Sequence, residues 1–163
     1  MTTTTLSSVP VMKPWLGAEE AAAASEAIAS GWIAQGPRVA AFEEAFAATV
    51  GANHAVAVSS CTTGLHLALA VHGIGPGDEV VVPSFSFIAT ANAVTYTGAR
   101  PVFADVDSRT GNLTASSIAA ALTPQTRAVI AVHQAGVPLD LDDVRDLCCL
   151  LYTSDAADDT PCV

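Results

Sequence analysis

The chain has 163 residues, of which 51% are hydrophobic and 13% are charged, and its formal net charge is −10. The apolar content excludes a disordered chain, because enough surface can be buried to offset the entropy cost of folding. Only 6 Lys and Arg residues stand against 16 Asp and Glu residues, which argues against nucleic acid or an anionic membrane as a partner.

The sequence also lacks the marks of exported and metal-binding proteins. Residues 1–15 have neither the basic nor the apolar region of a secretion signal, and no stretch reaches the roughly 18 apolar residues of a membrane-spanning helix. The 4 cysteines have the spacing of neither a zinc site nor a disulfide framework, and no pair of histidines has metal-ligand spacing. We therefore expect a cytoplasmic protein without a bound metal.

Ala-rich stretches alternate with short apolar runs from residue 18 onward. Helices are predicted over residues 18–30 and 38–50, because each stretch of helix formers ends at a glycine. Apolar runs without polar alternation are typical of strands buried on both faces, and they lie at 54–58, 79–82, 101–104 and 128–132. Further helices are predicted at 63–72, 87–97 and 114–122. The alternation predicts an α/β fold with a mainly parallel sheet and flanking helices.

The last residues of the chain differ from the rest. A helix is predicted to begin near Leu141, but the run from Cys149, CLLYTSDAADDTPCV, follows no helical or strand period. Because CLLYTSDAADD resembles a translated sequencing adapter, we interpret residues 149–163 as a non-native tail, with a genuine acidic tail as the alternative. Residues 1–13 are then a flexible lead, and residues 14–148 form the domain.

The segment VSSCTTGL, residues 58–65, follows an apolar run and opens a predicted helix. Backbone N–H groups at a helix start lack partners and the helix dipole is positive there, so this turn can bind an anion, most often a phosphate. Thr62 and Thr63 add hydroxyl donors, whereas Cys61 has no candidate base and is interpreted as a small residue in the turn. The alternative is one capping hydroxyl and a neutral surface, since the lysine and glycine pattern of a P-loop is missing.

Two further segments lie where a ligand can bind. In PSFSFIAT, residues 83–90, a buried strand leads into a helix, and ligands of parallel sheets gather at this carboxyl end of the strands. Phe87 can stack on an aromatic ring there, although two Phe at this spacing are more often part of a core. The turn SGWIAQGPR displays Trp32 and Gln35. A Trp in a connector either covers a ligand or seals the core, and the pattern alone favours the seal.

Several motifs in a fixed order link these segments. They are PWLGAEE, SGWIAQGPRVAAFEEAFA, AVAVSSCTTGLHLALAVHGIGPGDEVVVPSFSFIATANAV, GARPVFADVD and AVHQAGVPLDLDDV. From about Pro14 to about Leu147, the chain thereby resembles the N-terminal part of the pyridoxal-phosphate-dependent sugar aminotransferases of the DegT/DnrJ/EryC/StrS type. The resemblance implies part of a fold-type-I large domain, a homodimer, and transfer of an amino group from an amino-acid donor to a nucleotide-linked keto sugar.

The resemblance also assigns roles by position. Cys61, Thr62 and Thr63 would hold the phosphate of pyridoxal phosphate, and Phe87 would stack on its pyridine ring. Trp32 and Gln35 match a turn near the substrate. The strand at 54–58 would be separated from the other strands by ones that come later in the family's sequence, which leaves it without pairing neighbours here.

The reaction needs groups that these positions do not supply. A lysine must form the Schiff base and a carboxylate must keep the pyridinium nitrogen protonated. In the family both lie beyond the matching part, and Lys13 is the only lysine of this chain. Asp105 and Asp107 are not substitutes, because they close a strand in a motif that the family carries in addition to the catalytic acid.

We therefore expect a truncated aminotransferase without catalytic residues of its own, which is inactive as it stands. One alternative is a non-catalytic module that binds a phosphorylated ligand at residues 59–64. Another is a different fold-type-I enzyme, such as an aldolase or a desulfurase.

Overall fold

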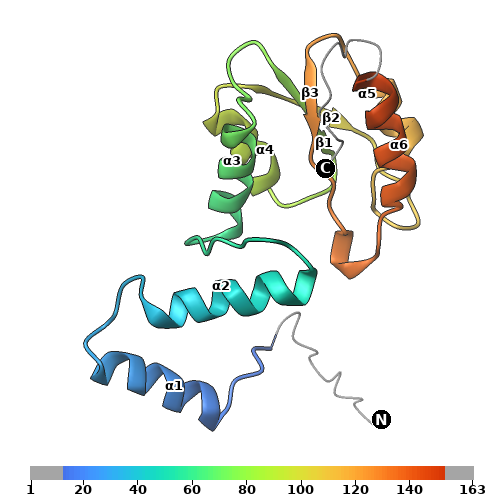
Figure 1. The fold of residues 1–163 in the computed structure, drawn as a ribbon. Helices are drawn as coiled ribbons and strands as arrows, with labels where there is room; N and C mark the ends of the chain where they lie inside the picture. Colours follow the sequence, from blue (N-terminus) through green and yellow to red (C-terminus); the bar gives the residue numbers. More distant parts are fainter. Residues whose placement is uncertain (1–12, 153–163) are drawn as a thin grey trace, which may run out of the picture. The chain divides into compact units, whose positions relative to one another are not determined.

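The structure is a computed structural model that describes residues 13–152, and these fall into two compact units that meet in sequence between Ala57 and Val58. Unit 1, up to Ala57, holds two helices, α1 (Ala18–Ala29) and α2 (Pro37–Val50). Unit 2, from Val58, holds a sheet with helices on both faces (Figure 1).

Local signals in the sequence explain both helices of unit 1. The N–H of Gly17 donates to Oε2 of Glu20 at 2.6 Å, which ties down the start of α1. Helix α2 begins at Pro37 and is followed by Gly51, whose φ of 71° lies in the left-handed region that glycine favours. Both predicted helices are confirmed. Within these helices Ala47 is buried, whereas Ile28, Phe42 and Phe46 are exposed.

The sheet of unit 2 has three parallel strands. Strand β1 (Glu79–Pro83) lies between β2 (Arg100–Ala104) and β3 (Thr126–Val129). Every residue of β1 is buried, as expected for a strand that is covered on both faces. The predicted parallel α/β architecture is confirmed for this unit.

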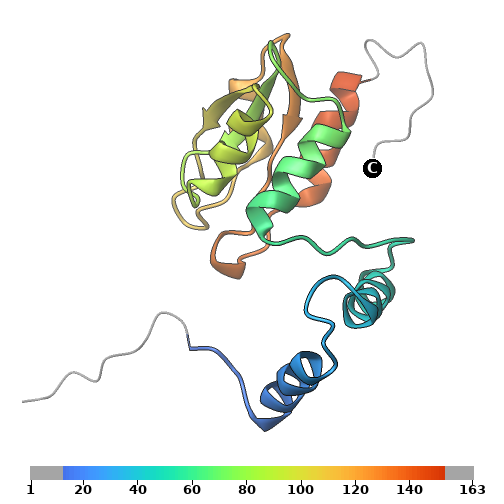
Figure 2. The same cartoon turned by 90° about the vertical axis from the view of Figure 1, so that its left-hand side faces the viewer.

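Helices α3 (Cys61–Val71) and α4 (Ala89–Tyr96) cover one face of the sheet, and α5 (Ala115–Ala121) and α6 (Leu141–Tyr152) cover the other (Figures 1 and 2). Alternate residues of β1 point to opposite faces, so they enter two separate cores. The buried residues of the first core are Leu69, Ile74, Val80, Val82, Val94, Ala99 and Ile130. Those of the second core are Val81, Ala104, Leu113, Ile118, Leu139 and Val144.

The strand predicted at residues 54–58 does not form, because this segment belongs to no sheet. The absence of pairing neighbours is what the family resemblance implied for this segment. Its residues His54 and Val56 are exposed, and the N–H of Ala57 donates to Oε1 of Glu43 at 2.7 Å. A strand exists only where a neighbouring backbone supplies hydrogen-bond partners, and here a glutamate side chain supplies one instead.

Four boundaries also differ from the prediction. Strand β3 spans Thr126–Val129, whereas the sequence predicts this strand at 128–132. Helix α3 begins at Cys61, two residues before the predicted start at 63, and α4 begins at Ala89, which leaves Phe87 in the preceding loop. Helix α6 runs to Tyr152, so the prediction that helical structure stops at 149 is wrong for residues 149–152. The run of Cys, Leu and Tyr there is compatible with a helix despite its lack of period. The rest of the proposed tail, 153–163, and residues 1–12 of the lead lie outside the described residues.

Candidate cofactor site

The start of α3 presents hydrogen-bond donors in the way an anion requires. Ser60 caps the helix, because its Oγ accepts from the backbone N–H of Thr63 at 3.2 Å. The hydroxyl of Thr63 lies 3.0 Å from that of Ser60 and 3.2 Å from that of Ser59. By the geometry of a helix start, the N–H groups of Cys61 and Thr62 lack acceptors within the helix. This donor set and the positive end of the helix dipole suit a phosphate.

One serine, Ser60, is the helix cap, as the neutral interpretation predicts. The remaining groups leave donors for an anion, so phosphate binding at this turn stays a prediction. Cys61 is exposed and Thr62 and Thr63 are half-buried, so all three lie at the surface where a ligand can reach them.

Phe87 lies in the loop that leaves β1 and is 78% exposed. The loop is anchored at its start, where the N–H of Ser84 donates to the carbonyl of Ala104 at 2.9 Å, and before α4, where the hydroxyls of Ser86 and Thr90 lie 2.8 Å apart. Phe87 is therefore a ring on an anchored loop and not a core residue, which is the less frequent of the two outcomes that the sequence left open.

The start of α3 and the 3-10 turn η1 (Gln134–Gly136) lie at the same end of unit 2 in both views (Figures 1 and 2). This is the end at which the parallel strands finish, so the loop with Phe87 leaves the sheet there as well. The structure thus places the residues predicted for the phosphate and the loop of the residue predicted for the ring at the same end of unit 2.

Sequence reasoning missed Asn112, a buried side chain at this end of the sheet. Its side-chain amide joins the loop after β2 to the turn after β3. The Nδ2 group donates to the carbonyl of Val137 at 2.9 Å, and Oδ1 accepts from the N–H of Gln134 at 2.9 Å. The letters TGNL signal only a turn, because the partners of Asn112 lie more than 20 residues away in the sequence.

Asp107 shapes the loop after β2. Its Oδ1 accepts from the backbone N–H groups of Arg109 at 3.0 Å and Thr110 at 3.1 Å. These backbone hydrogen bonds, Arg109 first, lower the pKa of the Asp107 carboxyl below its usual value. The carboxylate of Asp107 is thus engaged in building its own turn.

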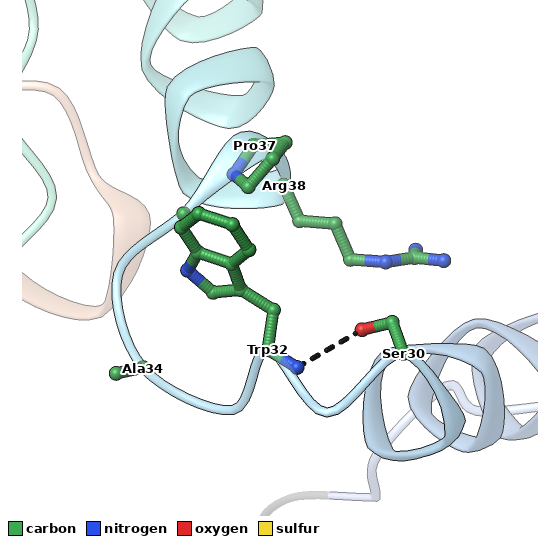
Figure 3. A pocket seen from close by; sticks show the side chains of 6 residues that line it. Ser30, Trp32, Ala34, Pro37 and Arg38 are labelled. Carbon is green, nitrogen blue, oxygen red and sulfur yellow. Dashed lines mark hydrogen bonds between the residues drawn. The ribbon is translucent and has the colours of Figure 1, made fainter.

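In unit 1, Trp32 and Gln35 belong to the turn between α1 and α2, and Figure 3 shows Trp32 in this turn. The indole Nε1 donates to the carbonyl of Gln35 at 2.6 Å, and the N–H of Trp32 donates to Oγ of Ser30 at 3.1 Å. Gly36 is required here, because a Cβ at this position would overlap the indole ring. These contacts place the indole ring against Gly36.

The indole of Trp32 is 59% exposed and borders a hollow of about 220 Å³ that Arg38 also lines. Within unit 1 this contradicts the prediction that Trp32 seals a core, since a seal would be buried. Arg38 pairs with Glu26 at 2.8 Å, and both side chains are exposed.

Pyridoxal phosphate needs a site for its phosphate, a site for its ring and a lysine for its aldehyde, and unit 2 offers residues for the first two. The α3 start fits the phosphate, and Phe87 fits the ring, but a Schiff base needs a lysine, and Lys13 lies in unit 1 before the first helix. Among residues 13–152 no group of three His, Cys, Asp or Glu side chains is arranged to hold a metal ion.

A parallel sheet with a helix start that suits an anion and an aromatic ring at its carboxyl end is the arrangement of a cofactor-binding α/β enzyme. Residues 14–158 match the model of the DegT/DnrJ/EryC1/StrS aminotransferase family, and the chain belongs to this family. The family consists of sugar aminotransferases that depend on pyridoxal phosphate, and the sheet is part of the fold-type-I architecture.

Three relatives illustrate the match. The spore coat polysaccharide biosynthesis protein SpsC of Bacillus subtilis (strain 168) is 49% identical over 136 residues, which are 83% of this chain and 35% of SpsC. The crystal structure of aminotransferase TlmJ from Streptoalloteichus hindustanus is similar with a TM-score of 0.79 at 46% identity, over 88% of this chain and 40% of TlmJ. The PLP form of the putative sugar aminotransferase Spr1654 from Streptococcus pneumoniae has a TM-score of 0.85 at 28% identity, over 93% and 39% of the two chains.

The chain therefore spans little more than a third of the length of these relatives. None of the helices described in residues 13–152 combines the length and the apolar character needed to cross a membrane.

Proposed function

We propose that this chain is the cofactor-phosphate half of a pyridoxal-phosphate-dependent aminotransferase that moves an amino group from an amino-acid donor to a nucleotide-linked keto sugar. The observation that carries the proposal is the start of α3, where hydroxyl and backbone donors gather at the same end of unit 2 as the Phe87 loop. The family membership supports the reaction class, and the relatives named for polysaccharide biosynthesis support a sugar as the acceptor.

Each residue in the proposal has a task of binding or orientation. The N–H groups of Cys61 and Thr62 and the hydroxyls of Thr62 and Thr63 hold the phosphate dianion, and the dipole of α3 adds to their attraction. Phe87 fixes the plane of the pyridine ring by stacking. Pyridoxal phosphate, when bound, supplies the electron sink of the reaction. Trp32 and Gln35 are assigned to the substrate, with the indole as a flat surface for it.

We also propose that these 163 residues do not complete the reaction by themselves. A lysine must exchange the proton at the reacting carbon, and the one lysine, Lys13, precedes α1 at a position to which the family resemblance assigns no Schiff base. The exposed thiol of Cys61 suits the reducing cytoplasm. The exposed Phe42 and Phe46 of α2 suit a surface that a second copy covers in a homodimer.

Equilibrium dialysis with pyridoxine 5′-phosphate tests the cofactor part of the proposal. This compound has the ring and the phosphate but no aldehyde, so it reports binding without reaction at Lys13. We expect saturable binding that inorganic phosphate displaces. The variant Thr63→Val, which loses the hydroxyl near Ser59 and Ser60, should bind about tenfold more weakly, because hydrogen bonds to a charged group contribute about 1.5 kcal/mol or more.

A matched control is Thr49→Val, because Thr49 is an exposed helical threonine of unit 1 whose hydroxyl donates to Ala45 O at 2.8 Å. It should leave the affinity unchanged. Equal binding by the wild type and Thr63→Val would contradict the assigned phosphate site.

The catalytic part is tested separately with pyridoxal phosphate, a nucleotide-linked keto sugar and an amino-acid donor. We expect no amino sugar, and turnover by the 163-residue chain would refute the proposed inactivity. A module that binds phosphorylated ligands without cofactor specificity is the competing function. It predicts equal affinity for pyridoxine 5′-phosphate and for a simple alkyl phosphate, whereas a ring site at Phe87 predicts a preference for the former.

A further inference from the structure

Asn112 is buried, with 3% of its surface exposed, and all four of its polar atoms have hydrogen-bond partners. Its backbone N–H donates to Oγ1 of Thr110 at 3.2 Å, and its carbonyl accepts from the N–H of Asp107 at 2.9 Å. Its side chain reaches a different loop, where Nδ2 donates to the carbonyl of Val137 and Oδ1 accepts from the N–H of Gln134. The backbone thus belongs to the turn after β2 and the side chain to the turn after β3.

The turn after β3 has a shape that its own sequence does not favour. Ala135 has a φ of 51°, and it is the non-glycine residue of the described chain with a positive φ. A residue with a Cβ in this region costs about 1 kcal/mol or more and persists where its surroundings hold it in place. Here the two side-chain bonds of Asn112 hold the turn on both sides of Ala135, at Gln134 and Val137.

Gly111 brings a third loop into the same cluster. An atom in the position of its missing Cβ would lie 3.2 Å from Cγ of Gln134 and 3.4 Å from Cδ1 of Phe85. Phe85 stands two residues before Phe87 in the loop that leaves β1. The loops after all three strands therefore meet around Gly111 and Asn112.

We propose that Asn112 is a positioning residue of the cofactor site: it holds the turn at Gln134–Gly136, which meets the loop of Phe85 and Phe87 at Gly111, in the arrangement that receives the pyridine ring. The inference rests on the proposed function. It deepens that function by separating two ends of the site: α3 holds the phosphate, and the loops joined through Asn112 shape the space for the ring.

The substitution Asn112→Asp tests this, because it replaces the NH₂ group by an oxygen of nearly the same size. The bond from Gln134 survives, whereas the donor to Val137 becomes an acceptor facing a carbonyl. The turn should then move, and the affinity for pyridoxine 5′-phosphate should fall by about tenfold, the effect of one buried hydrogen bond. The affinity for inorganic phosphate, measured by competition, should stay within about twofold of the wild type, because the α3 start is unchanged.

Glu79→Gln is the matched control. Glu79 is as buried as Asn112 and also joins separate segments, but it lies at the beginning of β1, the opposite end of the sheet. A substitution that acts only through stability should reduce the melting temperature in both variants and spare ligand affinity in both. Loss of ring affinity in Asn112→Asp alone is the expected result.

A second variant tests the role of the strained turn. In Asn112→Asp with Ala135→Gly, glycine adopts the positive φ without cost, so the turn regains its shape and part of the affinity returns. If Asn112→Asp does not melt cooperatively, Gly111→Ala takes its place. Its Cβ would crowd Cγ of Gln134 at 3.2 Å and its φ of 71° strains alanine, so the turn should move and ring binding should weaken more than phosphate binding.

The outcomes separate the two proposals. If the wild type binds neither pyridoxine 5′-phosphate nor phosphate, the proposed function fails. If the wild type binds and Asn112→Asp binds equally well, or loses phosphate and ring affinity together, the positioning role is overturned and the cofactor site stands.

Discussion

Units 1 and 2 both contain many apolar side chains, but the large ones are buried mainly in unit 2. The three valines of β1 and Ile118 of α5 have no exposed surface, whereas Ile28 of α1 is 70% exposed and Phe46 of α2 is 50% exposed. Burial of apolar area is the main favourable term in folding, so an apolar sequence stabilises a fold only where a second layer covers it. Unit 2 has that second layer on both faces of its sheet, and within unit 1 helices α1 and α2 do not supply one.

The largest expected difference between the units comes from replacing one isoleucine by alanine in each of them. Ile118→Ala should lower the free energy of unfolding by about 2–5 kcal/mol, because it leaves a cavity between α5 and the sheet. Ile28→Ala, at an exposed position, should change it by no more than about 0.5 kcal/mol. Urea denaturation of both variants measures the difference. Similar losses would mean that α1 is buried in the folded protein and would break the contrast between the units.

A smaller effect is expected at the helix starts. Ser60→Ala removes the side-chain cap of α3 and should cost about 1 kcal/mol, because the N–H of Thr63 loses its acceptor. Helix α2 begins at Pro37, and its cap residue Gly36 makes no side-chain hydrogen bond, so no corresponding substitution in unit 1 can remove one. Thermal unfolding followed by circular dichroism checks this, with added phosphate restoring part of the stability. An unchanged melting temperature would show that the cap is dispensable.

Acid should destabilise unit 2 through Glu79. The pKa of its carboxyl is lowered, first by the hydrogen bond from Oγ1 of Thr123 at 2.7 Å and also by the ion pair with Arg100, while burial partly opposes this. A lowered pKa in the folded state stabilises it above the unfolded value of about 4.3, and this contribution is lost as the pH falls through the folded value. Melting temperatures from pH 7 downward should therefore decline less steeply in Glu79→Gln than in the wild type. If the melting temperatures of both proteins fall equally steeply with pH, Glu79 does not cause the acid destabilisation.

The smallest effect should be the same in both units. The exposed pairs of Arg38 with Glu26 and Arg145 with Asp142 have equal distances of 2.8 Å. Because water screens both, Arg38→Gln and Arg145→Gln should each cost no more than about 0.5 kcal/mol in denaturation experiments. A larger loss in Arg38→Gln would show that the hollow beside Trp32 depends on the guanidinium for its shape.

The sequence predicts most elements of this fold because their signals are local. Glycines end the helices of unit 1, and uninterrupted valines identify β1 as a strand that is buried on both faces. The strand at 54–58 fails for the opposite reason: its apolar letters are right for a strand, but pairing depends on a neighbour that no local pattern reports.

The candidate site divides in the same way. The hydroxyl run at the start of α3 is visible in the letters, since a helix start and its donors are contiguous. Asn112 is not, because its role depends on Gln134 and Val137, which only the folded sheet brings near. The assignments of Phe87, Trp32 and Gln35 came from resemblance to a family, and the structure adds that the two aromatic rings are exposed.

The division of the β1 valines between two cores has a consequence for the proposed ligand. A slip of one residue against β2 would turn Val80 and Val82 toward the core that Val81 now fills, so the pairing of Val82 with Phe103 has no near alternative. The loop that carries Phe87 begins one residue after this strand. The register of β1 against β2 therefore fixes where this loop begins. Inserting or deleting one residue in β1 would move the Phe87 ring, even though every residue of the loop stayed the same.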